Sequence, residues 1–205
     1  MPQYSSVSFD TLLKQARNNG RSALADLLNS YRHYLRLLAR VQLCKNVQVR
    51  VSPSDVAQES ILAAQKAFPR FRGETENELV AWLRKVLASR LADAARFHSA
   101  QRRDVNTEKR LDESVEESSL ALQLLLPQVQ DSPSQIVAKR EEAVLLSEAL
   151  QRLPADYSEV IVQRHLEGKP FAEISESMNR TVPSVKAIWA RAMASLRQQL
   201  GADPS

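Results

Sequence analysis

The stretch FAEISESMNRTVPSVKAIWARAMASLRQ, residues 171–198, predicts two amphipathic helices joined by a turn of four residues. Apolar residues recur in it at the i, i+3, i+4 and i+7 spacing of one helix face. They are Phe171, Ala172, Ile174 and Met178 in the first helix, and Val182, Val185, Ile188, Trp189 and Met193 in the second. Between the helices, Asn179 enters a left-handed turn at little cost. Pro183 suits the first turn of a helix, where its missing N–H is not needed.

The spacing therefore indicates a helix-turn-helix, a motif that reads duplex DNA. The solvent side of its second helix carries small or cationic residues near the N-terminus, where a recognition helix meets base edges and phosphates. They are Ser184, Lys186, Ala187 and Arg191. Any two short helices that cross over a shared apolar contact have the same spacing, so the motif alone leaves DNA binding and plain helix packing open.

Composition favours an all-α protein. The chain has 205 residues, 43% of them hydrophobic, with only four glycines against nine prolines and few aromatic residues. This length suits two small domains or one of medium size. A formal net charge of +4 permits nucleic acid as a partner without proving it.

Charge is distributed unevenly along the chain. Residues 83–103 hold six cations and one acid, which predicts a basic helix. Residues 104–119 hold six acids and two bases, with scattered serines and no helical apolar stripe, which predicts a flexible acidic linker. We therefore expect a first domain at 8–103, a linker at 104–132 and a second domain at 133–200.

Cysteine and histidine usage gives no sign of a metal site or a cofactor. The single Cys44 excludes a disulfide within the chain and suits a reducing cytoplasm, and its apolar neighbours predict that it is buried. No segment approaches the ~18 apolar residues of a membrane span, and the N-terminus lacks an export signal. We expect a cytoplasmic protein without a cofactor.

Turn and cap signals divide the chain into helices. Residues 8–44 form two helical stretches with a break at Asn19 and Gly20. Ser52 and Pro53 begin the next helix, which ends near Pro69. Further helices are expected at 76–98, 133–152 and 157–166, the last closed by Gly168. Residues 120–126, LALQLLL, are either a helical turn that docks on a domain or a segment that binds a partner.

Four stretches, in order and at matching spacing, resemble the extracytoplasmic-function (ECF) group of bacterial RNA polymerase sigma factors. They are SPSDVAQESILAAQKAFPRFRG (52–73), ELVAWLRKVLASRLADAAR (78–96), LQRLPADYSEVIVQRHLEGKPFAEISESM (150–178) and SVKAIWARAMASLRQQL (184–200). The resemblance covers about residues 9–103 and 135–200. It implies two helical domains that bind core RNA polymerase and promoter DNA, and it leaves an anti-sigma factor open as a third partner.

The first stretch looks like the family's surface for the clamp coiled coil of the largest polymerase subunit. Its core-binding residues are expected to be Asp55, Gln58, Glu59 and Leu62, which share one side of a helix. Without the resemblance, such an acidic strip reads as a solvated face. With it, the acidic strip of a basic protein has a basic protein surface as its partner.

The second stretch looks like the family's promoter-melting and minus-ten-reading helix. Holding single-stranded DNA takes cations for phosphates and flat surfaces for bases. The expected contacts are Phe71, Arg72, Arg84, Lys85, Ser89, Arg90 and Arg96. Phe71 and Trp82 also read as core residues, Trp82 more strongly because it lies on the apolar stripe. Many family members have Asn where this chain has Ser89, so the base preference cannot be carried over.

The fourth stretch resembles the family's recognition helix for the minus-thirty-five element. The resemblance directs Ser184, Lys186, Ala187 and Arg191 toward the major groove, where Lys186 and Arg191 are the best candidates for guanine contacts. Arg164 and Arg180 are expected to meet phosphates. Pro183 is a departure, since a small residue is common there.

We therefore interpret the chain as a sigma factor and not an enzyme. The alternative is a stand-alone helix-turn-helix regulator, which would bind DNA without polymerase. An all-helical enzyme has little support, because His33, His98 and His165 are far apart and no phosphate loop or nucleophile motif is present.

Overall fold

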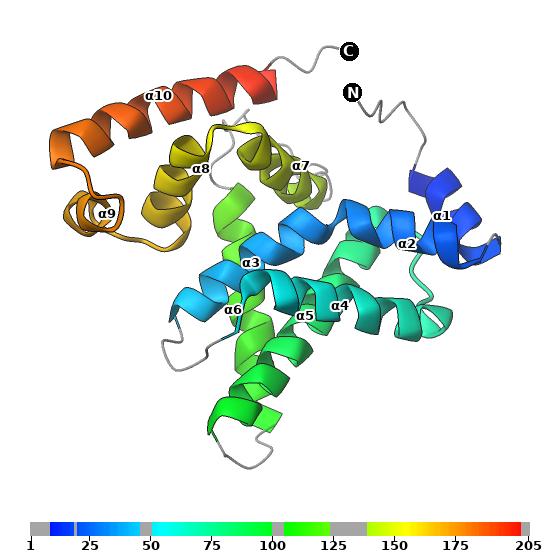
Figure 1. Ribbon diagram of the computed structural model, residues 1–205. Helices are drawn as coiled ribbons and strands as arrows, with labels where there is room; N and C mark the ends of the chain where they lie inside the picture. The colour runs from blue at the N-terminus through cyan, green and yellow to red at the C-terminus, as the bar shows by residue number, and fades with distance from the viewer. Residues whose placement is uncertain (1–8, 19, 46–50, 100–104, 124–138, 202–205) are drawn as a thin grey trace. The chain divides into compact units, whose positions relative to one another are not determined.

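The structure, a computed structural model, describes residues 9–18, 20–45, 51–99, 105–123 and 139–201 (Figure 1). Every regular element within these residues is a helix, which confirms the predicted all-α class. The helices form two compact units. The first contains the described residues of Met1–Arg40 and Gln48–Val115, and the second those of Val41–Val47 and Glu116–Ser205.

The chain begins with three short helices, α1 (Phe9–Asn18), α2 (Arg21–Ser30) and α3 (Arg32–Lys45). Gly20 has a φ of 82° at the predicted break, a conformation that costs glycine little. The second predicted stretch is split at Tyr31, which ends α2 and whose hydroxyl donates to Glu76 Oε1 at 2.8 Å. This hydrogen bond ties the α2–α3 junction to the start of α5.

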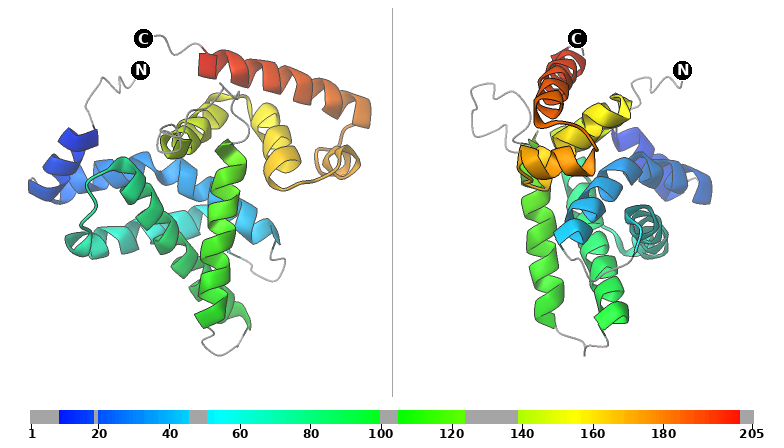
Figure 2. Two further views of the ribbon diagram at one scale, coloured as in Figure 1. Left: turned by 180° about the vertical axis from the view of Figure 1, so that it is seen from behind. Right: turned by 60° about the vertical axis from the view of Figure 1, so that its left-hand side comes forward.

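Helix α4 (Pro53–Ala67) begins at the predicted cap. The Ser52 hydroxyl accepts a hydrogen bond from the Ser54 backbone N–H at 3.2 Å, and Pro53 occupies the first turn. The helix packs against α2 and α5 (Figure 2) and ends in a short 3-10 turn, η1 (Phe68–Arg70). Its fully buried residues include Val56, Ala57, Ile61 and Ala64.

Helix α5 (Glu76–Ser99) begins at a capping box that the sequence analysis missed. The Glu78 carboxylate accepts from the Glu74 and Thr75 backbone N–H groups at 2.8 and 3.0 Å, and the Glu78 N–H donates to the Thr75 hydroxyl at 3.3 Å. These hydrogen bonds, the one from Glu74 first, lower the pKa of Glu78. The signal was the Thr-x-x-Glu spacing of Thr75 and Glu78.

The prediction of a flexible linker is wrong for Val105–Gln123, which form helix α6. Leu111, Val115, Ser118 and Ser119 are buried at i, i+4, i+7 and i+8. Two of these four are serines, so hydrophobicity alone did not reveal the stripe. Ser118 is fixed by a buried hydrogen bond of 2.8 Å from the Gln42 side chain. Residues 124–132 lie outside the described part of the chain, as do most of the side chains of segment 120–126.

The second unit ends with α7 (Lys139–Arg152), α8 (Ala155–Ile161), a π-helical turn η3 (Val162–Leu166), α9 (Phe171–Ser177) and α10 (Val182–Gly201). Helix α10 contacts α7, α8 and α9, and Figures 1 and 2 show it lying across all three. Gly168 has a φ of 72° at the predicted stop after η3. Of the predicted helix 133–152, residues 133–138 lie outside the described residues.

The prediction that Cys44 is buried is wrong, because Cys44 is exposed near the end of α3. The apolar neighbours Leu38 and Val41 are buried as expected. Helical spacing alone would keep Cys44 on the side of Val41, three residues earlier, but Cys44 is the second-last residue of α3, where less of the domain covers the helix.

Candidate functional site

The helix-turn-helix has the predicted geometry. Residues 178–181 form a four-residue turn in which Asn179 has a φ of 51°. The turn is closed by the Arg180 N–H, which donates to the Ser175 carbonyl at 2.9 Å, and by the Asn179 N–H, which donates to the Glu176 carbonyl at 3.1 Å. The two helices are therefore joined by a turn with a defined backbone path.

The apolar faces of the two helices meet as expected, with one exception. Ile174, Val185, Ile188 and Met193 are buried. Ala172, which the sequence analysis placed inside, is exposed, because two residues advance a helix by about 200° and carry Ala172 to the side opposite Ile174.

The outer face of α10 presents part of the predicted DNA-contacting set. Ser184, Ala187 and Arg191 share one side, at i, i+3 and i+7, with Ala187 and Arg191 exposed and Ser184 partly exposed. The Arg191 Nε donates to the Ala187 carbonyl at 3.2 Å. Lys186 is exposed on an adjacent side of α10, over the Phe171 ring.

A cluster of rings and cations lies where η3, α9 and α10 meet. The Arg164 guanidinium carbon lies 4.8 Å from the Phe171 ring centroid, and the Lys186 Nζ lies 5.8 Å from it. The Trp189 Nε1–H donates to the His165 Nε2 at 3.0 Å. His165 must therefore be neutral and unprotonated at Nε2. Burial first, and then the Arg164 charge, lower the pKa of His165.

Arg180 lies in the turn and is paired with an acid. Its guanidinium contacts the Asp156 carboxylate at 2.6 Å, and both side chains are about half exposed to solvent. Such surface pairs contribute about 0 to 1 kcal/mol, so a phosphate can replace Asp156 as the partner of Arg180 at small cost.

The predicted polymerase-binding residues form one exposed face of α4. Asp55, Gln58, Glu59 and Leu62 are all exposed, at i, i+3, i+4 and i+7. Leu62 is 45% exposed, and among the described residues only Leu120 and Leu145 are comparable large apolar residues on the surface. A single exposed leucine is ordinary on a protein surface, so the exposure makes this face accessible without assigning it a partner.

Arg84 is wrongly predicted as a DNA contact. It is 3% exposed, and its guanidinium donates to the Tyr34 hydroxyl at 3.4 Å. Helical spacing explains the error, because Arg84 lies four residues after Val80 and three before Leu87, both fully buried. Its neighbour Lys85 is exposed.

The remaining predicted cations of α5 surround one acid. Arg90 contacts the Asp93 carboxylate at 2.8 Å, and Arg96 binds its other oxygen. Ser89 accepts a weak hydrogen bond of 3.4 Å from Arg90. Lys85, Ser89, Asp93 and Arg96 share one side of the helix, so the predicted minus-ten face carries a carboxylate that the prediction did not include.

Phe71 is a core residue and not a surface platform, which corrects its predicted role. Phe71 is 8% exposed, and its ring lies 4.9 Å from the Trp82 ring and 5.8 Å from the Phe68 ring, centroid to centroid. Gly73 makes room for it, since a Cβ there would lie 2.4 Å from the Phe71 Cζ. Arg72 is exposed and donates to the Pro69 carbonyl at 3.2 Å. The sequence had left the core reading of Phe71 open.

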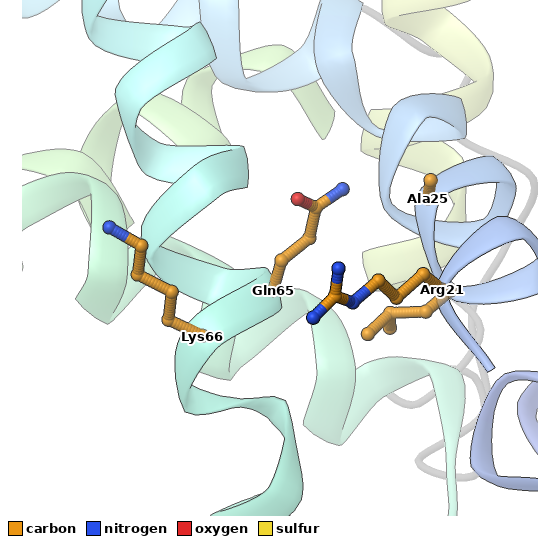
Figure 3. A pocket seen from close by; sticks show the side chains of 5 residues that line it. Arg21, Ala25, Gln65 and Lys66 are labelled. Atoms are coloured by element: carbon orange, nitrogen blue, oxygen red, sulfur yellow. The ribbon is translucent and has the colours of Figure 1, made fainter.

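A surface hollow of about 550 Å³ lies between α2 and α4. Figure 3 shows the side chain of Arg21, from α2, extending toward α4, where Gln65 is located. The residues that line it are Arg21, Leu24, Ala25, Gln65 and Lys66, which offer cations and an amide but no acid, thiol or imidazole. Nothing in the sequence pointed to this hollow.

Within the described residues, no group of three or more acidic, histidine or cysteine side chains is placed to hold a metal ion. None of the helices in this part of the chain combines the length and the apolar character needed to cross a membrane.

Comparison with known proteins finds similarity to sigma factors. Residues 143–196, from α7 to α10, match the family model "Sigma-70, region 4". The chain is 26% identical over 191 residues, 93% of its length and 83% of the relative's, to the ECF RNA polymerase sigma factor SigD of Mycobacterium tuberculosis. These matches support an ECF-type sigma factor.

Two other sigma factors extend this likeness. The chain is 27% identical over 146 residues, 71% of its length and 73% of the relative's, to the ECF RNA polymerase sigma-E factor of Haemophilus influenzae. It is 20% identical over 202 residues, 97% of its length and 91% of the relative's, to the RNA polymerase sigma-H factor of Bacillus subtilis. Because these matches extend well beyond region 4, they favour a sigma factor over a stand-alone helix-turn-helix regulator.

Proposed function

We propose that this ECF-type sigma factor binds core RNA polymerase and directs it to promoters that have two separate elements. The observation that carries the proposal is the exposed recognition face of α10, within a chain that aligns with sigma factors over most of its length. Residues 8–103 would act as region 2 and residues 133–200 as region 4, with 104–132 as the connection. Two weak sites on one chain gain affinity through effective concentration.

The exposed face of α4 is the proposed polymerase-binding surface. Asp55 and Glu59 supply two carboxylates one helical turn apart, and Leu62 supplies an apolar contact one turn further on. A basic protein surface with an apolar centre complements this arrangement. An anti-sigma factor that covers the same face would keep polymerase away, and competition between the two for this face is part of the proposal.

The proposed minus-ten surface is the exposed side of α5. Lys85 and Arg96 are its cations, with Arg90 to one side and Ser89 at the position where many family members have Asn. Arg72, exposed in the preceding loop, extends the surface. Arg84 and Phe71 are left out because both are buried.

The proposed minus-thirty-five surface is the outer face of α10 together with the cations beside it. Arg191 and Lys186 are proposed to contact base edges, and Ser184 and Ala187 let the helix approach the groove floor closely. Arg164 and Arg180 are proposed to bind phosphates, which orient the protein without reading sequence. We propose no catalytic activity and a cytoplasmic location, where polymerase and promoters are found.

The test is reconstitution with purified bacterial core polymerase. The chain is used to capture core enzyme, and the complex is then used for run-off transcription from a pool of promoter fragments. Capture with promoter-dependent transcripts is expected. Binding of duplex DNA by the chain alone, without capture of polymerase, would instead establish the stand-alone regulator.

A charge-reversal pair tests the polymerase-binding face. Asp55→Lys with Glu59→Lys is expected to abolish capture while leaving the helical circular dichroism signal unchanged. Asp10→Lys with Asp26→Lys is the matched control, because it makes the same charge change at exposed positions of α1 and α2. Equal loss of capture in both pairs would mean that total charge, and not this face, governs binding.

A further inference from the structure

The Phe171 ring carries two cations from different elements. Arg164 belongs to η3 and lies 4.8 Å from the ring centroid, whereas Lys186 belongs to α10 and lies 5.8 Å from it. Both distances fall within the roughly 6 Å over which a cation is attracted by the negative face of an aromatic ring. One side chain at the start of α9 thus contacts a cation from the element before the helix-turn-helix and a cation from its second helix.

The ring itself is held in place. Phe171 and Trp189 meet edge to face, with centroids 5.7 Å apart and ring planes at 74°, an arrangement that aromatic pairs favour. Trp189 is in turn fixed by its hydrogen bond to His165. Phe171 therefore has little freedom to follow a moving cation, and the cations must adjust to the ring.

We infer that Phe171 is a positioning residue for promoter binding, which holds Arg164 and Lys186 in the orientation in which they meet DNA. The inference rests on the proposed minus-thirty-five role of these two cations, and it assigns to Phe171 a contribution to DNA binding without any DNA contact of its own.

The physical reason is preorganisation. A long cationic side chain loses rotamer freedom when it binds a phosphate or a base, and this loss opposes binding. A ring contact restricts the side chain beforehand, yet unlike a carboxylate it leaves the positive charge available for DNA. Arg164 is fixed a second time, because its Nη1 donates to the Lys169 carbonyl at 3.0 Å.

Lys186 depends on the ring more heavily. Lys186 forms no ion pair within the described part of the chain, and its ammonium group makes a cation–π contact with the Phe171 ring. The loss of the ring is therefore expected to affect Lys186 more than Arg164, even though Arg164 lies closer.

The test replaces Phe171 with phenylalanines that carry one, two and three ring fluorines. Fluorination nearly keeps the shape of the ring and progressively removes the negative charge of its face, so a role in filling space alone would respond little to it. The affinity of the reconstituted holoenzyme for a duplex promoter selected from the pool is measured for each variant. We expect a stepwise loss that reaches roughly three- to tenfold with three fluorines.

Conventional variants supply the controls. Phe171→Tyr keeps the ring face and is expected to bind within about twofold of wild type, whereas Phe171→Leu is expected to match the trifluorinated variant. Combined with Lys186→Ala or Arg164→Ala, Phe171→Leu should cause less than the sum of the separate losses. Combined with Arg191→Ala, whose side chain is outside the cluster, the losses should add.

The outcomes separate the two proposals. If the wild-type chain brings polymerase to no promoter, the proposed function fails. If the wild-type holoenzyme binds and the fluorinated series binds equally well, or if all three double variants are additive, the positioning role of Phe171 is overturned while the proposed function stands.

Discussion

The basic helix α5 and the region around α10 carry similar numbers of cationic residues, but the side chains have different partners in the two regions. On α5, Arg84 is buried against Tyr34, and Arg90 and Arg96 share the Asp93 carboxylate. Around α10, Arg164 and Lys186 lie over a ring and Arg191 donates to a backbone carbonyl. Of the four cations proposed to contact DNA there, Arg180 is the one paired with a carboxylate within the described residues, that of Asp156.

The difference decides how much positive charge DNA can use. A carboxylate neutralises the cation that it holds, whereas rings and carbonyls orient a cation and leave its charge in place. Counting lysines and arginines in a sequence therefore overstates the DNA-binding capacity of α5. We expect α10 and its neighbours to supply more electrostatic affinity per cation than α5 does.

The largest expected effect separates Arg84 from the DNA-binding cations. Arg84→Ala removes a buried side chain and is expected to destabilise the fold by about 2 to 4 kcal/mol. Lys85→Ala, next to it but exposed, should change stability by no more than about 0.5 kcal/mol. Urea unfolding followed by circular dichroism measures both. A stable Arg84→Ala protein with weakened promoter binding would return Arg84 to the DNA surface.

Arg84 also shows what the sequence did and did not contain. Its burial follows from helical spacing, since Val80, Leu87 and Leu91 mark the same side of α5. A cation of a basic segment can contact DNA only if its side of the helix is exposed, and the side that carries Arg84 is buried. The spacing of Asp55, Gln58, Glu59 and Leu62 assigned them to one side of a helix, and the structure places all four on one exposed face.

Features that depend on local chemistry were the most predictable. The Ser52 cap, the left-handed Asn179 and the stop at Gly168 each follow from one residue type in one backbone conformation. Features that depend on distant partners were not. No local signal pairs Arg164 with Phe171 or Trp189 with His165, because those contacts form only when η3, α9 and α10 assemble.

Helix α6 was missed for a related reason. Its buried stripe contains Ser118 and Ser119, and a buried serine looks like a loop residue until its partner is known. The partner of Ser118 is Gln42, 76 positions earlier in the chain. A long-range hydrogen bond of this kind leaves no periodic trace in the sequence.

The second prediction concerns the cation proposed to read bases. Arg191→Ala is expected to lower discrimination at one position of the upstream element by about 1 to 3 kcal/mol and to leave polymerase capture unchanged. Arg197→Ala is the matched control, an exposed arginine on another side of α10. Holoenzyme binding to promoters with single substitutions measures the effect. Equal losses at every promoter position would make Arg191 a phosphate contact instead.

The third prediction tests the neutralised cations of α5 directly. Asp93→Asn removes the charge that Arg90 and Arg96 share, so both become available to DNA. Because partly exposed ion pairs are worth about 0.2 to 1 kcal/mol, we expect promoter affinity to rise by up to about fivefold, with a steeper dependence on salt.

Asp26→Asn makes the same charge change on α2 and should have little effect on either quantity. If the two variants raise affinity equally, the gain comes from net charge. If Asp93→Asn lowers affinity, the carboxylate holds Arg90 and Arg96 in the orientation that binds DNA. Helix α5 would then orient its cations for DNA, as α10 and its neighbours are proposed to do.

The smallest expected effect tests the support beneath the ring that holds Arg164 and Lys186. His165 accepts a hydrogen bond at Nε2 from Trp189, and burial lowers its pKa below 6.5. As the pH falls through about 6.5, the unfolded chain binds a proton at this position before the folded protein does. The contribution of neutral His165 to the free energy of unfolding is therefore present above that range and is lost below it. His33 behaves in the same direction, because burial and then Arg36 and Arg32 lower its pKa.

The variant His165→Gln separates the pH-dependent contribution of His165 from that of His33, because glutamine keeps a hydrogen-bond acceptor but does not titrate. Between about pH 7.5 and about pH 5.5, wild type should lose more stability than His165→Gln, by less than about 1 kcal/mol. His33→Gln should retain the His165 part of the loss, and urea midpoints at the two pH values measure all three proteins. If wild type and His165→Gln lose equally, protonation of His165 does not disturb the Trp189 contact. If they differ, promoter affinity should fall over the same pH range more in wild type than in His165→Gln, because the ring that positions the two cations loses its support.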